Sequence, residues 1–426
     1  MSENKFNKVV LWWVTDQLPY PPRNGVTLPS FTYAKNLKAY VEVRLVILVD
    51  IKYPLEDLDF KENEKIFGKI IRINFEKRTL LRRVFEELIG IEMFQHSYGI
   101  SGAKTIFPLS KNDRLLVTPI SAVAKLRNIK LAEEKNIKIA LALVNDCTAG
   151  EYYFRSQNRA GNWRHKLKAR LDRWRSKLIG RIEAELLAPY RYVLLQTKRD
   201  AEIFQQLTGP DSEGRHRVLP NGINPSLFST KQKGRKYVIF MAELSGEYGP
   251  IAKWLVSEVW LRMRIDNGFD LLVVGKGASP ALKRVFAEAK GVRHIEFVSN
   301  IETVYEYAAI AISPVFKGFG LINKTLDAMA AGVPVLGGLA AFNGIIGFEA
   351  GVHGIICERA DTNAFANALN TLIRNTSLCV RVGQAGHDLL AKGQFDWNLS
   401  TERLAKYLGL VTELNASNDM EEKNIA

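Results

Sequence analysis

Cysteine is scarce in this sequence. Only three cysteines occur among 426 residues, at Cys147, Cys357 and Cys379. They are too few and too widely spaced for a disulfide framework or a cysteine metal cluster. A reduced, cytoplasmic compartment therefore fits best, and no metal-binding signature is present.

Long apolar runs are absent as well. No stretch approaches the roughly 18 apolar residues that a helix needs to span a bilayer. Residues 1–8 are polar and lead directly into an expected strand, which argues against a signal peptide. We therefore expect any contact with a membrane to be peripheral.

Acidic residues are in the minority. The 45 Asp and Glu against 59 Lys and Arg give a formal net charge of +14. This charge suits nucleic acid, an anionic lipid surface or a polyanionic substrate, and it carries no information about the fold. No nucleic-acid-binding module is recognisable, so we expect no nucleic-acid partner.

The largest charge imbalance lies in residues 155–181, where Asp172 is the single acidic residue against ten Lys and Arg. Apolar residues recur there every three or four positions and would share one face of a helix. They are Trp163, Leu167, Leu171, Trp174, Leu178 and Ile182. This face either packs on the core of its domain or lies on an anionic membrane. The membrane interpretation predicts the lipid-facing residues Trp163, Trp174, Arg170, Arg173 and Lys177.

The alternation of strands and helices predicts two α/β domains, because it begins again after the polar linker 229–236. In the first half, strands are expected at 8–14, 43–49, 114–118, 137–144 and 192–196. Helices are expected at 29–39, 122–135 and 199–207, and a basic amphipathic one around 80–88. In the second half, strands are expected at 237–241, 271–274, 295–298 and 310–312, with helices at 251–263 and 325–331.

Residues 313–334 form the most informative stretch. They predict a strand end, a glycine-bearing loop and a helix that stops at Gly332. The amino terminus of such a helix attracts anions, and Lys324 adds a positive charge there. Asp327 lies one turn further and can accept hydrogen bonds from two ribose hydroxyls. The stretch therefore predicts a nucleotide site, although Lys324 and Asp327 are also compatible with an ordinary solvated pair.

Asp146 follows the expected strand 137–144. Functional side chains gather at the carboxyl ends of strands in a doubly wound sheet. Asp146 is therefore a candidate catalytic residue that orients an acceptor hydroxyl or takes its proton. The alternative role is the N-cap of the following helix.

The sequence G-F-G-L-I-N-K-T-L-D-A-M-A-A-G-V-P-V at 318–335 resembles the donor segment of glycosyltransferase family 4, of the GT-B fold and the bacterial surface-polysaccharide type. The sequence V-L-P-N-G-I-N-P-S-L-F at 218–228 resembles the linker segment of the same family, with Asn224 where aspartate is usual. Phe395-Asp-Trp397 is similar to the aromatic pair that precedes its closing helix. The resemblance extends over most of the chain.

The resemblance implies two Rossmann-like domains that face each other across a cleft. The first would comprise residues 1–230 together with a closing helix at 396–412 that crosses back to it. The second would comprise 231–395 and bind the nucleotide sugar, and 413–426 would be a polar tail. The implied reaction is transfer of a sugar from a nucleoside-diphosphate sugar with retention of configuration, with no obligatory metal and no cofactor.

The donor-binding residues that the resemblance implies come from several loops. They are Gly25, Thr27, Gly246, Phe297, Val298, Gly318, Gly320, Leu321, Asn323, Lys324 and Asp327. Together with the basic segment 155–181, the resemblance predicts a lipid-linked or membrane-anchored glycan as acceptor and a location on the inner face of the cell membrane.

Two departures from the family pattern keep other functions open. The first glutamate of the usual pair is missing, since Phe319 or Lys317 occupies its place. The loop 242–250 has no basic residue, and the first one after it is Lys253. A catalytically silent relative that serves as a binding subunit and a GT-B nucleotide-sugar epimerase are therefore the alternatives to a transferase.

Overall fold

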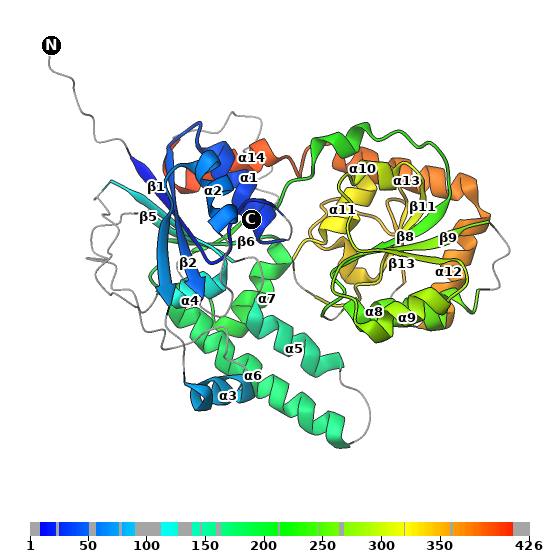
Figure 1. The fold of residues 1–426 in the computed structure, drawn as a ribbon, viewed down its shortest axis with the longest axis horizontal. Coiled ribbons are helices and arrows are strands. Elements are labelled where there is room, and N and C mark those ends of the chain that lie inside the picture. The colour runs from blue at the N-terminus through cyan, green and yellow to red at the C-terminus, as the bar shows by residue number, and fades with distance from the viewer. Residues whose placement is uncertain are drawn as a thin grey trace, which may run out of the picture. The chain divides into compact units, whose positions relative to one another are not determined.

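The computed structural model divides the chain into two compact units (Figure 1). It describes residues 9–22, 25–50, 57–75, 79–89, 112–126, 139–144, 147–158, 163–211, 214–246, 248–263, 268–318, 320–357 and 361–411. The first unit comprises Met1–Asn221 and Trp397–Ala426, and the second comprises Gly222–Asp396. The boundary therefore lies between Asn221 and Gly222, before the polar linker at which the sequence places it.

The first unit is built on a seven-stranded parallel sheet in the order β3-β2-β1-β4-β5-β6-β7. The strands are β1 (Val10–Thr15), β2 (Glu42–Asp50), β3 (Ile71–Phe75), β4 (Arg114–Val117), β5 (Ile139–Leu143), β6 (Tyr192–Leu195) and β7 (His216–Val218). The order reverses between β1 and β4. A switch point of this kind opens a crevice at the carboxyl ends of the two strands, where ligands bind in doubly wound sheets.

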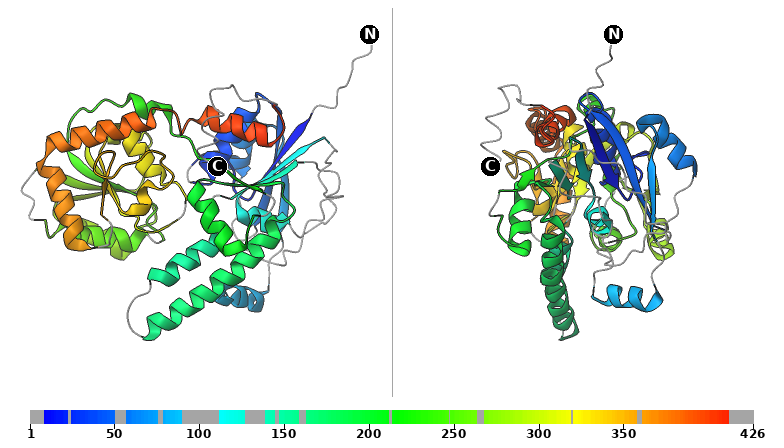
Figure 2. Two further views of the ribbon diagram at one scale, coloured as in Figure 1. Left: turned by 180° about the vertical axis from the view of Figure 1, so that it is seen from behind. Right: turned by 90° about the vertical axis from the view of Figure 1, so that its left-hand side faces the viewer.

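Helices cover both faces of this sheet (Figures 1 and 2). They are α1 (Thr27–Leu37), α2 (Asp57–Phe67), α3 (Leu80–Ile89), α4 (Ile120–Leu126), α5 (Thr148–Asn158), α6 (Trp163–Leu187), α7 (Lys198–Thr208) and α14 (Trp397–Tyr407). Thr197 is the N-cap of α7, because its side chain accepts a hydrogen bond from the Asp200 N–H.

The central strand β1 is buried along its whole length, which its uncharged sequence V-L-W-W-V-T allows. The indole Nε1 of Trp12 donates to Asp113 Oδ2 at 2.9 Å, so this buried polar atom is satisfied. Asp113 Oδ1 accepts from the Val10 N–H at 3.3 Å. The buried carboxylate therefore ties the beginning of β1 to the residue that precedes β4.

The last helix, α14, returns to the first unit as predicted. Trp397 packs edge-on against Tyr33 of α1 with ring centroids 5.2 Å apart, an arrangement that aromatic quadrupoles favour. The Tyr33 hydroxyl donates to the Pro220 carbonyl at 2.8 Å, and Arg114 Nε donates to the Leu408 carbonyl at 2.7 Å. Helix α14 and Leu408 just after it are thus held to α1 and β4, while Tyr33 joins α1 to the segment that leaves the first unit.

The second unit holds a six-stranded parallel sheet in the order β10-β9-β8-β11-β12-β13. Its strands are β8 (Tyr237–Met241), β9 (Asp270–Val274), β10 (Val292–Ile295), β11 (Ala308–Ser313), β12 (Val335–Gly337) and β13 (Ile355–Ile356). Here the order reverses between β8 and β11. The loops that follow these two strands therefore flank the switch point of the second sheet.

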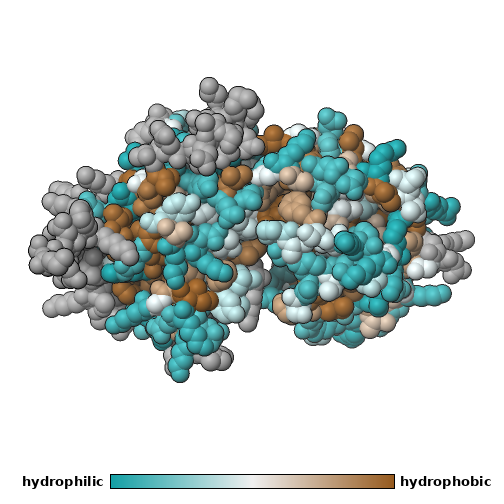
Figure 3. All heavy atoms as spheres, turned by 90° about the horizontal axis from the view of Figure 1, so that it is seen from above, coloured by the Kyte–Doolittle hydropathy of each residue, from teal (hydrophilic) through white to brown (hydrophobic). Residues whose placement is uncertain are grey.

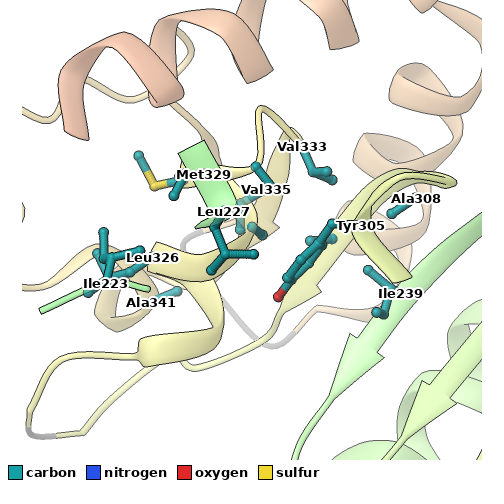
Figure 4. Packing of buried hydrophobic residues seen from close by; sticks show 14 of the residues in the cluster. Ile223, Leu227, Ile239, Tyr305, Ala308, Leu326, Met329, Val333, Val335 and Ala341 are labelled. Atoms are coloured by element: carbon teal, nitrogen blue, oxygen red, sulfur yellow. The ribbon is translucent and has the colours of Figure 1, made fainter. Parts of the chain in front are cut away.

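Two apolar layers cover the faces of this sheet. The helices are α8 (Tyr248–Trp254), which continues as the π-helix η4 (Leu255–Trp260), α9 (Pro280–Glu288), α10 (Glu302–Tyr305), α11 (Asn323–Ala330), α12 (Thr362–Arg374) and α13 (Thr376–Leu390). Two 3₁₀ helices, η3 (Pro225–Ser229) and η5 (Leu339–Phe342), complete the unit. Figure 4 shows Leu326 and Met329 of α11 in one layer, close to Leu227 of η3.

Three expectations differ from the structure at element ends. The strand expected at 295–298 is β10 at Val292–Ile295, because Val292 aligns with Leu271 and Ile295 with Val274 of β9. Phe297 and Val298 therefore lie in the loop after the strand. The helix expected at 251–263 begins at Tyr248 and changes to π geometry at Leu255. Of the helix expected at 122–135, α4 covers residues up to Leu126, and 127–138 lie outside the described residues.

We expect Gly275→Ala to destabilise the second unit by about 3 kcal/mol, because overpacking against backbone has costs of this order. A Cβ atom at Gly275, directly after β9, would lie 1.8 Å from the Ala242 carbonyl oxygen after β8. Urea denaturation measures the change. Gly246→Ala is the control, because a Cβ atom there meets nothing within 4 Å. Equal unfolding free energies for the two variants would contradict the packing explanation.

Candidate functional site

The amino terminus of α11 is the centre of the candidate site. It lies at the switch point of the second sheet, after the loop that leaves β11. The Thr325 hydroxyl donates to Ser313 Oγ at 2.9 Å, and both side chains are buried. This bond attaches the first turn of α11 to the end of β11. The direction in which the helix amides point is therefore set by the sheet.

The N-cap residue of this helix, Ile322, forms no side-chain capping hydrogen bond, and no acidic residue occupies the first turn. The N-terminal amides and the positive end of the helix dipole are consequently not neutralised by an acid of the helix itself. Gly320, with φ of 76°, allows the tight turn before the helix. Such a terminus favours an anion, phosphate included.

Lys324 and Asp327 are brought together on α11. Lys324 Nζ lies 3.2 Å from Asp327 Oδ2, and the Asp327 side chain is only 16% exposed. The two residues thus form a pair, but the carboxylate is largely buried rather than solvated. Burial raises the pKa of Asp327, the nearby Lys324 charge works against this rise, and the Glu302 charge adds to it.

Glu302 is a charged neighbour of Asp327 that was not predicted from the sequence. Its carboxylate accepts hydrogen bonds from Asn224 Nδ2, at 3.2 Å, and from the Ser226 hydroxyl. Asn224 Oδ1 in turn accepts from the Ser226 N–H and caps η3. An aspartate at position 224 could cap η3 but could not donate to Glu302. The asparagine is therefore suited to the carboxylate beside it.

The remaining predicted donor residues of this unit lie in three loops at the carboxyl edge of the sheet. Gly318, Gly320, Leu321 and Asn323 belong to the loop and first turn after β11. The Gly318 carbonyl accepts from Asn343 Nδ2 at 3.5 Å. Gly246 lies after β8, on the other side of the switch point. Val298 packs on the core after β10, whereas Phe297 is exposed.

A basic residue stands next to the loop after β8, although that loop contains none. The Lys276 carbonyl, in the loop after β9, accepts from the Leu244 N–H at 2.8 Å. Its Nζ atom lies 4.0 Å from Glu243 Oε2. Reasoning along the sequence missed Lys276 because it follows a different strand. The sequence feature that could have indicated Lys276 is its position just after a strand of the parallel sheet.

A comparison with models of protein families identifies a domain that covers most of the second unit. Residues 235–375 match the family described as glycosyl transferases group 1. The second unit contains a glycosyl transferases group 1 domain. The predicted glycosyltransferase is confirmed by this domain, while the narrower assignment to family 4 stays a prediction. No curated protein matches the sequence.

The fold of the whole chain is similar to that of several solved glycosyltransferases. Anabaena HepE in complex with UDP and glucose is 14% identical, with a TM-score of 0.63 over 95% of this chain and 100% of that one. Sucrose-phosphate synthase from Thermosynechococcus elongatus is 15% identical, with a TM-score of 0.61 over 94% and 98%. A mutant of S. aureus TarM with Fondaparinux, alpha-GlcNAc-glycerol and UDP is 11% identical, with a TM-score of 0.63 over 94% and 99%. These likenesses confirm the predicted GT-B fold.

The predicted residues of the first unit lie at the carboxyl edge of its sheet or outside the described residues. Thr27 is the first residue of α1 and is buried, and Gly25 stands just before it. A Cβ atom at Gly25 would meet nothing within 4 Å. Asp146 lies outside the described residues, so its catalytic role stays a prediction. Phe319, in the second unit, lies outside them as well.

Asp16 is a second carboxylate at this edge that sequence reasoning did not select. It follows β1 directly, at the switch point, and its side chain is 7% exposed. Asp16 Oδ2 accepts from the Ser121 hydroxyl at 2.6 Å and from Lys125 Nζ at 2.9 Å. Asp16 Oδ1 has no hydrogen-bond partner among the described residues. The sequence feature that could have indicated Asp16 is its position directly after a buried strand.

The amino terminus of α5, just after Asp146, is capped from another helix. Glu183 of α6 is fully buried, and its Oε1 accepts from the Thr148 N–H at 2.9 Å. Its Oε2 lies 3.4 Å from the Ala149 nitrogen. Burial raises the pKa of Glu183 to about 8, although these backbone hydrogen bonds lower it. The sequence did not reveal this contact, because the two helices meet only in the tertiary structure.

The apolar stripe of α6 does not pack on the core over its first half. Trp163, Leu167, Leu171 and Trp174 are 69%, 60%, 42% and 50% exposed. Of the stripe residues, only Ile182 is buried. The core-packing alternative is therefore wrong for the first four stripe residues. The predicted membrane-facing residues Arg170, Arg173 and Lys177 are exposed as well.

Up to Gly180 the buried residues of α6 are mostly polar or small, and large apolar residues are buried mainly towards its end. Asp172, Ser176, Ile179 and Gly180 come first, and Ile182, Glu183, Leu186 and Leu187 follow. The Ser176 hydroxyl donates to the Ala149 carbonyl at 2.8 Å. A Cβ atom at Gly180 would lie 2.3 Å from the Leu207 carbonyl oxygen. Close packing at Gly180 and the capping of α5 thus determine which face of α6 is buried. The hydrophobic pattern of the sequence could not indicate this face.

No group of His, Cys, Asp and Glu among the described residues is arranged to hold a metal ion. Within the same part of the chain, no helix combines the length and apolar character that crossing a bilayer requires.

We expect the unfolding free energy of the protein to fall as pH rises from about 4.5 to about 8. In this range the native state retains the Glu183 proton that the unfolded chain releases, and the full difference amounts to at most about 5 kcal/mol. Glu183→Gln should flatten this part of the profile in denaturant titrations. Glu185→Gln, on the exposed side of α6, is the control. If both variants keep the wild-type slope, Glu183 is not the group responsible.

Proposed function

We propose that the protein transfers a sugar from a nucleoside-diphosphate sugar to a glycan acceptor, with retention of configuration. The uncapped amino terminus of α11 with Lys324 is the observation that carries this proposal. The structures of HepE and TarM named above contain UDP. A diphosphate at the corresponding helix terminus would be bound by the same physical interactions.

In this proposal, the amides of α11 and Lys324 stabilise the diphosphate as the bond to the sugar breaks. Negative charge develops on the leaving group at that moment, and preorganised positive groups lower the barrier most there. Lys276, after β9, adds positive charge at the same edge of the sheet. The proposed reaction uses no metal ion and no cofactor, since these groups take the role of the charge-neutralising cation.

Asp327 is proposed to hold the ribose. Its pairing with Lys324 at 3.2 Å keeps the carboxylate in place before the donor arrives. When a phosphate attracts Lys324, the carboxylate becomes free to accept hydrogen bonds from the two ribose hydroxyls. The base would lie near Phe297 and Val298. Gly25 and Thr27 are proposed to approach the donor phosphate from the first unit, and Asp146 to act on the acceptor hydroxyl.

We further propose that the acceptor is a lipid-linked or membrane-anchored glycan at the inner face of the cell membrane. The exposed tryptophans and basic residues of α6 support this part of the proposal. Aromatic side chains bordered by Lys and Arg are typical of helices that lie on anionic lipid.

We expect UDP or GDP, alone or as a nucleotide sugar, to raise the melting temperature of the wild-type protein. A ligand at 100 times its dissociation constant adds about 2.7 kcal/mol of stability. Asp327→Ala should abolish the shift for the nucleotide that works, because alanine has no acceptor for the ribose hydroxyls. Glu258→Gln, in the exposed i,i+4 pair with Arg262, is the control and should retain the shift.

The same titration can contradict the proposal. If no nucleotide shifts the melting temperature at millimolar concentration, a catalytically silent relative explains the chain better. A nucleotide sugar that stabilises the protein but is epimerised without an acceptor would identify an epimerase. Slow hydrolysis of the donor, measured as released nucleotide, would support the transferase.

We expect the combined variant Arg170→Gln, Arg173→Gln and Lys177→Gln to weaken binding to anionic vesicles about 100-fold at low salt. Each basic side chain near an anionic surface contributes about 1 kcal/mol. Sedimentation with phosphatidylcholine vesicles, with and without phosphatidylglycerol, measures the effect. The control variant replaces the exposed Arg284, Lys290 and Lys392 of the second unit with glutamine, an equal change of charge. If the wild-type protein is not retained by anionic vesicles, the membrane part of the proposal is wrong.

A further inference from the structure

Helix α3 carries a second exposed apolar face, to which nothing above assigns a role. Its large apolar side chains lie on the side of the helix opposite Glu86, which is buried. They are Leu80, Leu81, Val84, Phe85 and Leu88, with exposed fractions from 53% to 85%. A short helix that buries a glutamate and leaves five large apolar side chains exposed is unusual, because burial of such side chains normally drives folding.

This helix is bonded to α6. The Arg175 guanidinium donates to the Leu88 carbonyl at the end of α3. Arg175 is itself held by Asp172, with an N–O distance of 3.6 Å, and by the ring of Tyr152. Trp174, the residue before Arg175, belongs to the exposed stripe of α6. The last exposed apolar residue of α3, Leu88, thus lies beside the exposed stripe of α6.

Figures 1 and 2 show α3 and the first half of α6 at the same end of the first unit, away from its sheet. Figure 3 views the molecule from above, so the side on which α3 and the first half of α6 lie faces away from the viewer; hydrophobic side chains are scattered among hydrophilic ones on the face that it shows. The α3–α6 surface, defined as the five exposed apolar residues of α3 and the four of α6, belongs to the first unit. Exposed apolar side chains that gather in this way mark an interaction site.

The charges around the α3–α6 surface select its occupant. Between positions 163 and 181 the sequence contains Asp172 as its one acidic residue, and that side chain is buried. The exposed positions carry Arg164, Lys166, Lys168, Arg170, Arg173 and Lys177. A second copy of this chain would bring the same positive charges against them, which is unfavourable. The surface therefore suits a partner that is apolar inside and anionic at its boundary.

We infer that the α3–α6 surface is a two-part contact with an anionic phospholipid bilayer, in which α3 supplies the apolar insertion and α6 the headgroup contacts. The Arg175 hydrogen bond holds the end of α3 beside Trp174. In the inferred contact, the leucine and phenylalanine side chains of α3 enter the apolar part of the bilayer, and the basic side chains of α6 stay among the lipid headgroups. The inference deepens the membrane part of the proposed function and rests on it for the location of the acceptor. It also predicts that part of the vesicle binding persists at high salt, because salt screens charge interactions but not the burial of apolar side chains.

The first test removes the apolar side chains of α3 in the full chain. The combined variant Leu81→Ser, Phe85→Ser and Leu88→Ser should lower the partition coefficient onto phosphatidylglycerol-containing vesicles by about 100-fold, and should abolish the retention that remains at high salt. These side chains are exposed, so the fold should persist. Leu261→Ser, Ile346→Ser and Val380→Ser, at exposed apolar positions of the second unit, form the control and should bind as the wild type does. Equal binding by the α3 variant and the control would overturn the inference.

The second test follows insertion directly. The three native cysteines are buried, so Leu81→Cys offers an exposed thiol for an environment-sensitive fluorophore. Its emission should shift to the blue with anionic vesicles and stay unchanged with a soluble polyanion such as heparin. A blue shift with heparin, or one in buffer that grows with protein concentration, would overturn the inference in favour of a polyanion or of self-association.

The outcomes separate this inference from the proposed function. The α3 variant should retain the nucleotide-induced rise in melting temperature, because its substitutions are in the first unit and α11 belongs to the second. Loss of vesicle binding with normal nucleotide binding supports the inference. Normal insertion of the labelled Leu81→Cys protein without any nucleotide binding would contradict the transferase and leave the membrane surface standing.

Discussion

The candidate site depends on one buried hydrogen bond, from the Thr325 hydroxyl to Ser313 Oγ. It joins the end of a central strand to the first turn of α11 and so directs the helix amides toward the switch point of the sheet. Lys324 precedes Thr325 in the first turn and Asp327 lies one turn further along the helix, so the same bond sets the position of both. A parallel sheet collects loops at one edge, which is why Gly246 and Lys276 reach this edge from other parts of the chain.

In the first unit, polar contacts decide the orientation of the longest basic helix. Glu183 caps α5, Ser176 bonds to Ala149, and Gly180 permits close approach to α7. Together these interactions turn a polar face of α6 inward. The apolar stripe, with Trp163 and Trp174, is then left outside, next to the exposed face of α3. A capping interaction in the interior thus determines which surface the protein presents.

The sequence predicted most elements because their signals are local. Strand β8 was expected at its observed bounds, since apolar residues between polar linkers indicate a buried strand. The errors concern contacts between distant residues. Strand β10 was misplaced because its position is set by pairing with β9. Whether the α6 stripe is buried or exposed stayed open at the sequence level, because hydrophobic periodicity does not reveal what lies opposite a face.

The sequence by itself determined two α/β units, the strand, loop and helix around Lys324 and Asp327, and the excess of positive charge at 155–181. These features depend on residue type and spacing over a few turns of chain. Only the tertiary structure decided that Asp327 is largely buried, that Glu302 lies beside Asn224, that Lys276 approaches the loop after β8 and that the stripe of α6 is exposed. Burial and electrostatic environment depend on which distant segments pack together, and a single sequence carries that information only through its fold.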